Sequence, residues 1–471
     1  MLKFGTDGWR GTIAKDFTFK NVAIATKAIS EYLKEAEKNP SLFIGYDTRF
    51  LSDKFALCSA TIAARSGIDV YLCESFAPTP VISHAVTFHK TSGAIIVTAS
   101  HNPYFYNGLK FKNSFGSSAS PKQTKIFEEK IKQTKEVDLP AVDIHMQNPE
   151  IKTANPKNEY FNHLESLVER KLISSSKLKV VVDPMFGAGQ GYYYQLLKRL
   201  GVNVLEIHNR INPFFGGLQP EPIMPHLNEL KQTVVSEGYD LGLALDGDAD
   251  RSGIIDDQGN FINSHQIFSL LLWHLTENKG QKGSVIKTVS TTSLIDKIAA
   301  TNTLPLVETP VGFKYISDHM INNDVLIGGE ESGGIGARGH IPERDGIFIG
   351  LLVLEMLALT KKTIPELLAK LFQKYGNFVY DRKDLDISDN LRKTFYEQLN
   401  QLNAQDFFNK QIDQTKNKDG VKYLFNDGSW LMLRLSGTEA VVRVYSEADS
   451  KSKVEELLKK GESLVTSLTS I

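Results

Sequence analysis

The segment Gly93-Ala94-Ile95-Ile96-Val97-Thr98-Ala99-Ser100-His101-Asn102-Pro103 joins an apolar run to a polar loop. The short apolar run predicts a buried strand, and Asn102-Pro103 predicts a turn directly after it. Ser100 and His101 therefore place a hydroxyl and an imidazole beyond the carboxyl end of a strand, where open α/β sheets bind ligands. Ser100 is a candidate nucleophile, and a simple capped turn is the alternative.

Helices and strands alternate around this segment. Apolar spacing predicts helices over 21–33 and from Ser52, and short apolar runs predict strands over 42–44, 70–72 and 94–97. This alternation favours a mostly parallel sheet with helices on its faces.

The alternation restarts twice. Further strands are expected at 178–182, 202–207, 241–245, 284–286, 306–307 and 325–327. Ser100, Asp246 and Glu330 each follow what we take as the last strand of their unit. We therefore expect the three loops to converge on one ligand.

The carboxyl-terminal part differs from these units. Residues 422–433 predict a hairpin about Asn426-Asp427-Gly428, followed by a strand over 441–445 and a helix over 454–468. We predict an α/β protein with three similar mixed, mostly parallel α/β domains and a smaller C-terminal α+β domain around a central cleft. The predicted domains span residues 1–153, 154–258, 259–372 and 373–471.

Composition narrows the class of protein. A net charge of -1 and a pI near 6.8 give no basic field for nucleic acid or an anionic membrane. Two cysteines, Cys58 and Cys73, argue against a disulfide framework. The amino terminus shows no signal-peptide pattern, and the apolar run 347–359 is interrupted by Glu355 and too short to span a bilayer. We expect a cytoplasmic protein that binds a small molecule; its oligomeric state is not predicted.

The run Asp246-Gly247-Asp248-Ala249-Asp250-Arg251 places three carboxylates after a strand. Their mutual repulsion calls for a cation, and hard oxygen ligands favour Mg2+. An EF-hand would need glycine where Arg251 stands, with helices on both sides. A haloacid-dehalogenase phosphatase would use the first aspartate as its nucleophile, usually with Thr or Val where Asp250 stands. Both alternatives fit less well than a metal loop of three aspartates.

Two later loops suit a phosphorylated sugar. The phosphate candidates are Arg434, Ser436, Gly437, Thr438 and Arg443, which offer guanidinium groups, hydroxyls and a flexible backbone. Glu330 and Ser332, in a glycine-rich loop, can bond to sugar hydroxyls. A solvated hairpin and a plain turn are the respective alternatives.

In order and spacing the four loops resemble the α-D-phosphohexomutase family, which includes phosphoglucomutase and phosphomannomutase. Residues 98–103 look like its phosphoserine loop, 246–251 its metal loop, 330–333 its sugar loop and 434–439 its phosphate loop. Subsidiary matches lie at 4–11, 45–49, 107–110 and 309–314. The resemblance covers nearly the whole chain.

The resemblance implies a phosphohexomutase, an isomerase of the EC 5.4.2 class, in which Ser100 carries a phosphoryl group. Mg2+ would bridge Ser100 to Asp246, Asp248 and Asp250. Residues implied near the reacting groups or the substrate are Arg10, His101, Lys110, Arg251 and Lys314. Glucose 1,6-bisphosphate would be the intermediate and activator.

The chain departs from the family's pattern at two positions. Ala440 stands where a proline is common, and Gly334 where mannose-accepting and amino-sugar members carry histidine. His340 either replaces that histidine or is structural. Thr98 resembles gluco- and mannomutases more than glucosamine mutases. We favour phosphoglucomutase, with phosphomannomutase or a dual enzyme as the main alternative. A hexose 1,6-bisphosphate synthase or a non-catalytic sugar-phosphate-binding regulator is less favoured.

Overall fold

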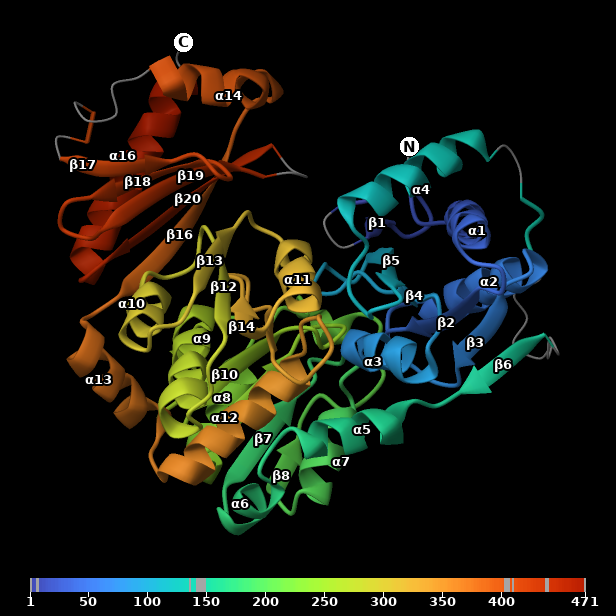
Figure 1. Cartoon of the computed structure of the whole chain (residues 1–471), viewed down its shortest axis with the longest axis horizontal. Coiled ribbons are helices and arrows are strands. Elements are labelled where there is room, and N and C mark those ends of the chain that lie inside the picture. The colour runs from blue at the N-terminus through green and yellow to red at the C-terminus, as the bar shows by residue number, and fades with distance from the viewer. Residues whose placement is uncertain are drawn as a thin grey trace.

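Four sheets follow one another along the chain. The computed structural model describes residues 2–5, 8–134, 137–140, 150–401, 407–408, 411–436 and 440–469. The four units form an arc, with the first (blue) and the last (red) at its two ends (Figure 1). The boundaries between the units remain a prediction.

The first unit is a six-stranded mixed sheet of order β1-β5-β4-β2-β3-β6. Its elements are β1 (Trp9–Thr12), α1 (Phe19–Ala36), β2 (Ser41–Tyr46), α2 (Ser52–Arg65), β3 (Asp69–Cys73), α3 (Thr79–His89), β4 (Gly93–Val97), β5 (Tyr106–Asn113), α4 (Pro121–Gln133) and β6 (Ile151–Ala154). The parallel strands β4, β2, β3 and β6 form one side; β5 pairs antiparallel with β4, and β1 pairs antiparallel with β5.

The second unit is a five-stranded sheet of order β11-β10-β9-β7-β8. Its elements are α5 (Lys157–Ser166), α6 (Arg170–Ser175), β7 (Lys179–Asp183), α7 (Tyr192–Arg199), β8 (Asn203–Glu206), η1 (Phe215–Gly217), α8 (Asn228–Glu237), β9 (Leu241–Leu245), β10 (Ser252–Asp256) and β11 (Phe261–Ile262).

The third unit is a four-stranded sheet of order β13-β12-β14-β15. Its elements are α9 (Ser264–Trp273), η2 (His274–Asn278), β12 (Ser284–Thr288), α10 (Leu294–Thr301), β13 (Leu306–Thr309), α11 (Phe313–Asn322), β14 (Val325–Gly329), β15 (Ile335–Ala337), α12 (Gly346–Thr360) and α13 (Ile364–Tyr375).

The last unit is an antiparallel sheet of order β16-β20-β19-β18-β17. Its elements are β16 (Val379–Asp386), α14 (Asp389–Gln401), β17 (Ile412–Lys416), β18 (Val421–Phe425), β19 (Trp430–Leu435), β20 (Val441–Ala448) and α16 (Lys451–Thr469). The predicted hairpin, strand and closing helix are confirmed, and so is the fold class of three mixed α/β units and a smaller α+β unit.

One expectation about the loops was wrong. The loops after β4, β9 and β14 do not end their units, because each leads into an antiparallel strand: β5, β10 and β15 respectively. The same strand, loop and return strand thus occur in all three α/β units. Each polar loop is anchored at both ends by the sheet, which fixes its position better than a single strand would.

The apolar run 347–359 lies within a buried helix, α12. Its residues 346–358 are all buried, and it packs against α6, α9, β9 and β10. Asp345 caps it by accepting from the amides of Ile347 and Phe348. The charge of Glu355 inside this helix is balanced by Lys279 Nζ at 2.8 Å and His274 Nε2 at 3.1 Å. No helix among the described residues is long and apolar enough to cross a membrane.

Candidate active site

Ser100 projects from the end of β4 toward the acidic loop of the second unit. Its backbone has a φ of 52°, in the left-handed region that non-glycine residues seldom adopt. The amide of Ser100 donates to Thr98 Oγ1 at 2.9 Å, which fixes this turn. Ser100 Oγ donates to Asp246 Oδ2 at 2.7 Å, and only 1% of the residue is exposed. Backbone strain at such a position is a common property of functional sites.

Arg49 fixes the serine loop, residues 98–103, through hydrogen bonds to backbone carbonyls. Its guanidinium donates to the carbonyl oxygens of Ser100 and Asn102, both at 2.6 Å, and to two more carbonyls downstream. Asp47 pairs with Arg49 at 3.2 Å and accepts from Thr98 Oγ1 at 2.6 Å. Residues 45–49 match a subsidiary motif of the family, but no role was predicted for Arg49; the arginine in that motif was the available signal.

The three aspartates follow β9 as predicted and form one cluster. Each offers a carboxylate oxygen, and these oxygens lie within 4.8 Å of one another. All three residues are buried, although Asp and Glu are seldom buried without partners. Gly247 permits the close approach of this loop to the serine loop, because a Cβ there would lie 2.4 Å from the carbonyl oxygen of Ser100. The flanking elements are strands, which excludes the EF-hand alternative.

The charge of the cluster fits a hard divalent cation. Burial raises the pKa of Asp246 well above its usual range, and the carboxylates of Asp248 and Asp250 raise it further. Asp250 Oδ1 accepts no hydrogen bond from a described residue. Among those residues, this is the one group of three or more His, Cys, Asp or Glu side chains arranged to hold a metal ion. Three carboxylates beside a serine oxygen suit Mg2+.

Basic side chains from all three α/β units surround this cluster. Lys110 Nζ, from β5, donates to Asp248 Oδ2 at 2.8 Å and to Asp250 Oδ2 at 2.9 Å. Arg344 Nη2 donates to Asp250 Oδ2 at 2.7 Å. Arg251 Nε lies 3.8 Å from Asp250 Oδ1. Arg344 was not predicted as a site residue, because it lies outside the four recognised loops.

Arg10 contacts the serine loop, and His101 lies within it. Arg10 Nη1, from β1, donates to Asn102 Oδ1 at 2.6 Å. His101 Nδ1 lies 3.4 Å from Ser100 Oγ. Burial lowers the pKa of His101 well below its usual value, and the charges of Arg251 and Arg10 lower it further.

Arg344 lies between the glycine-rich loop after β14 and the aspartate cluster, because it contacts both Glu330 and Asp250. Glu330 is buried and lies 3.8 Å from Arg344 Nη1; burial raises the pKa of Glu330 and the arginine opposes that effect. Ser332 is exposed. Lys314 is half-buried in the first turn of α11, and burial lowers its pKa.

The phosphate candidates lie on the last unit. Arg434 lies one residue before the end of β19, and its Nε donates to Asp419 Oδ2 at 2.9 Å. Arg443, on β20, lies 3.7 Å from Asp384 Oδ2, and Ser436 is buried. Gly437 and Thr438 lie outside the described residues.

His340 has structural partners. His340 Nε2 lies 2.8 Å from Asp345 Oδ2, and His340 Nδ1 lies 3.0 Å from His163 Nε2. Asp345 also accepts from Tyr160 OH at 2.7 Å. These contacts favour the structural interpretation of His340 over a sugar-binding one.

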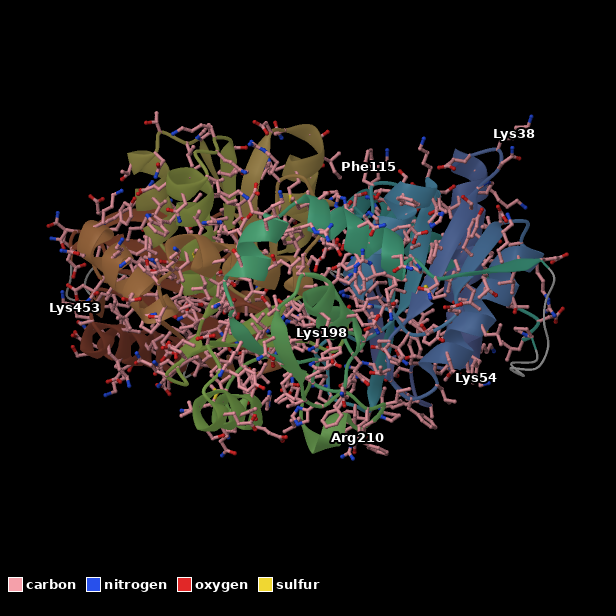
Figure 2. The ribbon with its side chains drawn as sticks, turned by 90° about the horizontal axis from the view of Figure 1, so that it is seen from below. Lys38, Lys54, Phe115, Lys198, Arg210 and Lys453 are labelled. Carbon is pink, nitrogen blue, oxygen red and sulfur yellow. The ribbon has the colours of Figure 1, made fainter. Side chains whose placement is uncertain are left out.

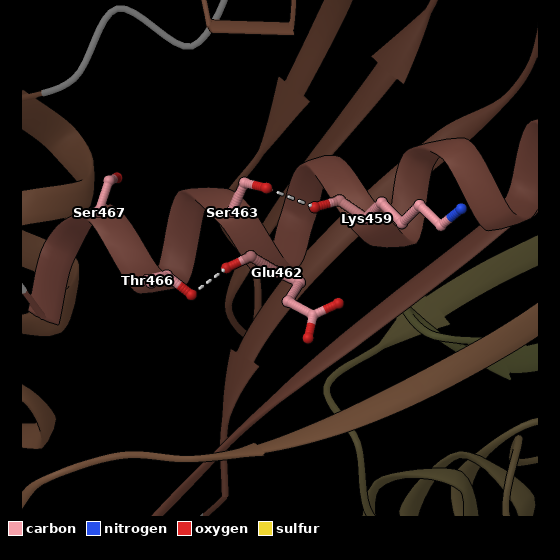
Figure 3. Close-up of a pocket in the computed structure, with 5 residues that line it drawn as sticks. All are labelled: Lys459, Glu462, Ser463, Thr466 and Ser467. Atoms are coloured by element: carbon pink, nitrogen blue, oxygen red, sulfur yellow. Dashed lines mark hydrogen bonds between the residues drawn. The ribbon is translucent and has the colours of Figure 1, made fainter.

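One surface depression, on α16, differs from this site. A depression of about 580 Å³ on α16 is lined by Lys459, Glu462, Ser463, Thr466 and Ser467 (Figure 3). The hydroxyls of Ser463 and Thr466 donate to carbonyls of their own helix, both at 2.9 Å. Figure 2 shows labelled basic residues such as Lys38 and Arg210 projecting at separate places on the molecule, consistent with the low net charge.

Comparisons with known proteins identify the family of the chain. Four family profiles, the phosphoglucomutase/phosphomannomutase alpha/beta/alpha domains I, II and III and the C-terminal domain, match residues 1–138, 158–259, 263–375 and 387–460. The chain belongs to the phosphoglucomutase/phosphomannomutase family. Its activity is that of a phosphohexomutase, an isomerase of sugar metabolism.

Relatives within the family carry different substrate names. A Thermococcus kodakarensis protein named phosphoglucomutase/phosphomannomutase is 32% identical over 97% of each chain. A Pyrococcus abyssi protein named as a phosphoglucosamine mutase is 31% identical over 98% of this chain and 97% of its own. The crystal structure of a Thermus thermophilus protein named as a phosphomannomutase superposes with a TM-score of 0.87, at 33% identity over 99% of both chains.

Proposed function

We propose that this phosphohexomutase interconverts glucose 1-phosphate and glucose 6-phosphate through phosphorylated Ser100. The observation that carries the proposal is the 2.7 Å contact between Ser100 Oγ and Asp246 within the buried aspartate cluster. A serine oxygen beside three carboxylates that fit a divalent cation suits phosphoryl transfer, which depends on positioning and charge neutralisation.

Several residues would hold the phosphoserine in place. Arg49 fixes the backbone of the serine loop, and Lys110 ties that unit to Asp248 and Asp250. Ser100, Asp246, Asp248 and Asp250 would hold Mg2+, which when bound neutralises charge on the transferring phosphoryl group. Arg10, His101 and Lys110 are the candidates for moving the proton of the sugar hydroxyl.

The reaction would proceed in two transfers. Phosphoserine gives its phosphoryl group to O6 of glucose 1-phosphate; the bond from phosphorus to Ser100 Oγ breaks, and the proton of O6 passes to Ser100 Oγ. The product, glucose 1,6-bisphosphate, turns around in the site. Its 1-phosphoryl group then returns to Ser100 Oγ, whose proton passes to O1, to leave glucose 6-phosphate. Both orientations need a sugar contact and a separate phosphate holder. We assign the sugar contact to Glu330, Ser332 and Lys314. We assign the phosphate holder to Arg434, Ser436, Gly437, Thr438 and Arg443. Arg251 would lie beside the transferred group.

Two residues support the choice of glucose: Gly334 argues against mannose and amino sugars, and Thr98 argues against amino sugars only. Gly334 stands in the sugar loop where a side chain is usual in mannose-accepting and amino-sugar members, and Thr98 begins the serine loop as in gluco- and mannomutases. The relatives carry all three substrate names, so the assay must compare the sugars directly.

The test is turnover of glucose, mannose and glucosamine 1-phosphates with Mg2+, with and without glucose 1,6-bisphosphate. Glucose 1-phosphate should give the highest kcat/KM. Ser100→Ala should lose at least about a thousandfold in kcat. The equally buried Ser59→Ala is the matched control and should keep its activity. Turnover by Ser100→Ala would contradict the phosphoserine mechanism; accumulating bisphosphate would indicate a synthase, and tight binding without turnover a regulator.

A further inference from the structure

Asp419 joins a phosphate candidate to a neighbouring domain through one oxygen atom. The residue lies between β17 and β18. Its Oδ2 accepts from Arg434 Nε at 2.9 Å and from the backbone amide of Val311 at 2.8 Å. Arg434 belongs to the last unit, whereas Val311 belongs to the third and lies three residues before Lys314. One carboxylate oxygen therefore contacts both a phosphate candidate of the last domain and the segment of the third domain that leads to Lys314.

The contact orients the arginine side chain. Burial is the largest single influence and lowers the pKa of Arg434, but the charges and hydrogen bonds of Asp419 and then Tyr445 together outweigh it, and the net pKa is raised. Only 13% of the Arg434 side chain and 25% of the Asp419 side chain are exposed. Asp419 engages Nε, and the fork of an arginine carries two further nitrogens that can hold a phosphate.

We propose that Asp419 is a positioning residue that aims Arg434 at the substrate phosphate and sets it relative to the segment leading to Lys314. The proposal rests on the function proposed above, since it takes Arg434 as a phosphate ligand. Fixing the guanidinium before substrate binds removes part of the entropic cost of binding. Loss of Asp419 should therefore weaken phosphate binding more than it slows the chemical step.

A plain contact between domains is the competing explanation, and the same turn supplies its control. Lys418 Nζ donates to the carbonyl oxygen of Glu308 at 2.6 Å, so it also joins the last unit to the third. No contact with Arg434 is found for Lys418 in the described part of the chain. Lys418→Ala thus loosens the interface and leaves Arg434 with its partner.

The experiment compares wild type, Asp419→Ala, Asp419→Asn and Lys418→Ala. Asp419→Ala should raise KM for the hexose phosphate about tenfold, the size expected for one charge-assisted hydrogen bond, with kcat changed less than about threefold. Asp419→Asn should recover most of the loss, because one amide oxygen can accept both bonds. Lys418→Ala should keep the wild-type KM. Equal increases for Asp419→Ala and Lys418→Ala, or an unchanged KM in Asp419→Ala, would overturn the proposal.

A second measurement separates this proposal from the proposed function. Calorimetric titration with inorganic phosphate needs no turnover and no choice of sugar. Asp419→Ala should bind inorganic phosphate about tenfold more weakly than wild type and Lys418→Ala. If wild type fails to convert glucose 1-phosphate but this pattern holds, the sugar assignment fails and the role of Asp419 stands. Equal affinities in all variants would remove that role.

Discussion

Arg344 Nη2 donates to Asp250 Oδ2 at 2.7 Å, so an arginine of the third domain neutralises a carboxylate of the second. Both side chains are buried, and a buried carboxylate that loses one of its two cationic partners is destabilised even though Lys110 remains beside it. Arg344→Met should lower the free energy of unfolding by about 3 kcal/mol without metal. Added Mg2+ should raise the melting temperature more in this variant than in wild type, because the cation replaces lost positive charge.

Arg338→Met is the control for this comparison. Arg338 pairs with Asp324 on the surface of the same domain, where both side chains are partly exposed. Such a pair contributes about 0 to 1 kcal/mol, and its loss should leave the Mg2+ effect unchanged. Equal Mg2+ shifts in Arg344→Met and wild type would contradict the charge argument; differential scanning calorimetry with Mg2+ or with EDTA measures both.

Gly334 provides the space that Arg344 occupies. A Cβ at Gly334 would lie 2.2 Å from Cδ of Arg344, so a larger residue must displace the arginine. Gly334→Ala should destabilise the protein by about 1 to 3 kcal/mol. In an Arg344→Ala background the same change should cost far less, because the colliding atoms are gone. Additive effects in this double-mutant cycle would show that Gly334 acts independently of the arginine.

Periodicity predicted most strands and helices, and polar residues at strand ends predicted where the site lies. The return strand β5 was not predicted, although Leu109-Lys110-Phe111-Lys112 alternates apolar and charged residues as a half-buried strand does. That pattern would also place Lys110 and Lys112 in solvent, whereas the structure buries them. Both lysines are buried only because partners from other domains neutralise them: Asp248 and Asp250 for Lys110, and Glu343 for Lys112. Such pairing depends on tertiary contact and leaves no local pattern.

Arg344 was missed as a site residue, and Arg49, although it lies in the matched segment 45–49, was given no role. Each lies far along the chain from the loop that it supports, and each acts on that loop through hydrogen bonds made only in the folded state. Local spacing identified the four loops because each keeps its polar residues within a few positions. It could not identify the arginines that fix those loops relative to one another.

Arg382 links the last domain to the sugar loop. Arg382 Nη1, on β16, lies 3.0 Å from Oε1 of Glu331, the residue next to Glu330. Glu331→Arg or Arg382→Glu alone should raise KM about two- to fivefold, a size typical of a partly exposed ion pair, and the double reversal should restore it. Lys383→Glu breaks the neighbouring pair with Glu462, which lies within the last domain, and should leave KM unchanged. Failure of the double reversal to recover KM would exclude a direct ionic coupling.

Three stacked histidines make the junction of the first three domains sensitive to acid. The ring of His163 lies 4.7 Å from that of His84 and 5.1 Å from that of His340. Burial, then the neighbouring His163 and His340, lowers the pKa of His84 from 6.5 to about 3, although Asp345 opposes this; His89 lowers it slightly further. Burial and His340 likewise lower the pKa of His163 to about 4.

The sign of the effect follows from these shifts. Above pH 6.5 His84 is neutral in both the folded and the unfolded chain. Between pH 6.5 and about 3, His84 is protonated in the unfolded chain and stays neutral in the folded chain. Stability is therefore lost progressively as pH falls below 6.5.

His84→Phe keeps an aromatic ring at this position but cannot bind the proton, and His84 Nδ1 has no hydrogen-bond partner among the described residues to lose. The melting temperature of His84→Phe should accordingly fall less than that of wild type between pH 6.5 and 4. His319→Phe, which replaces a partly exposed histidine of α11, should follow wild type. Parallel curves for His84→Phe and wild type would mean that acid destabilises the protein elsewhere.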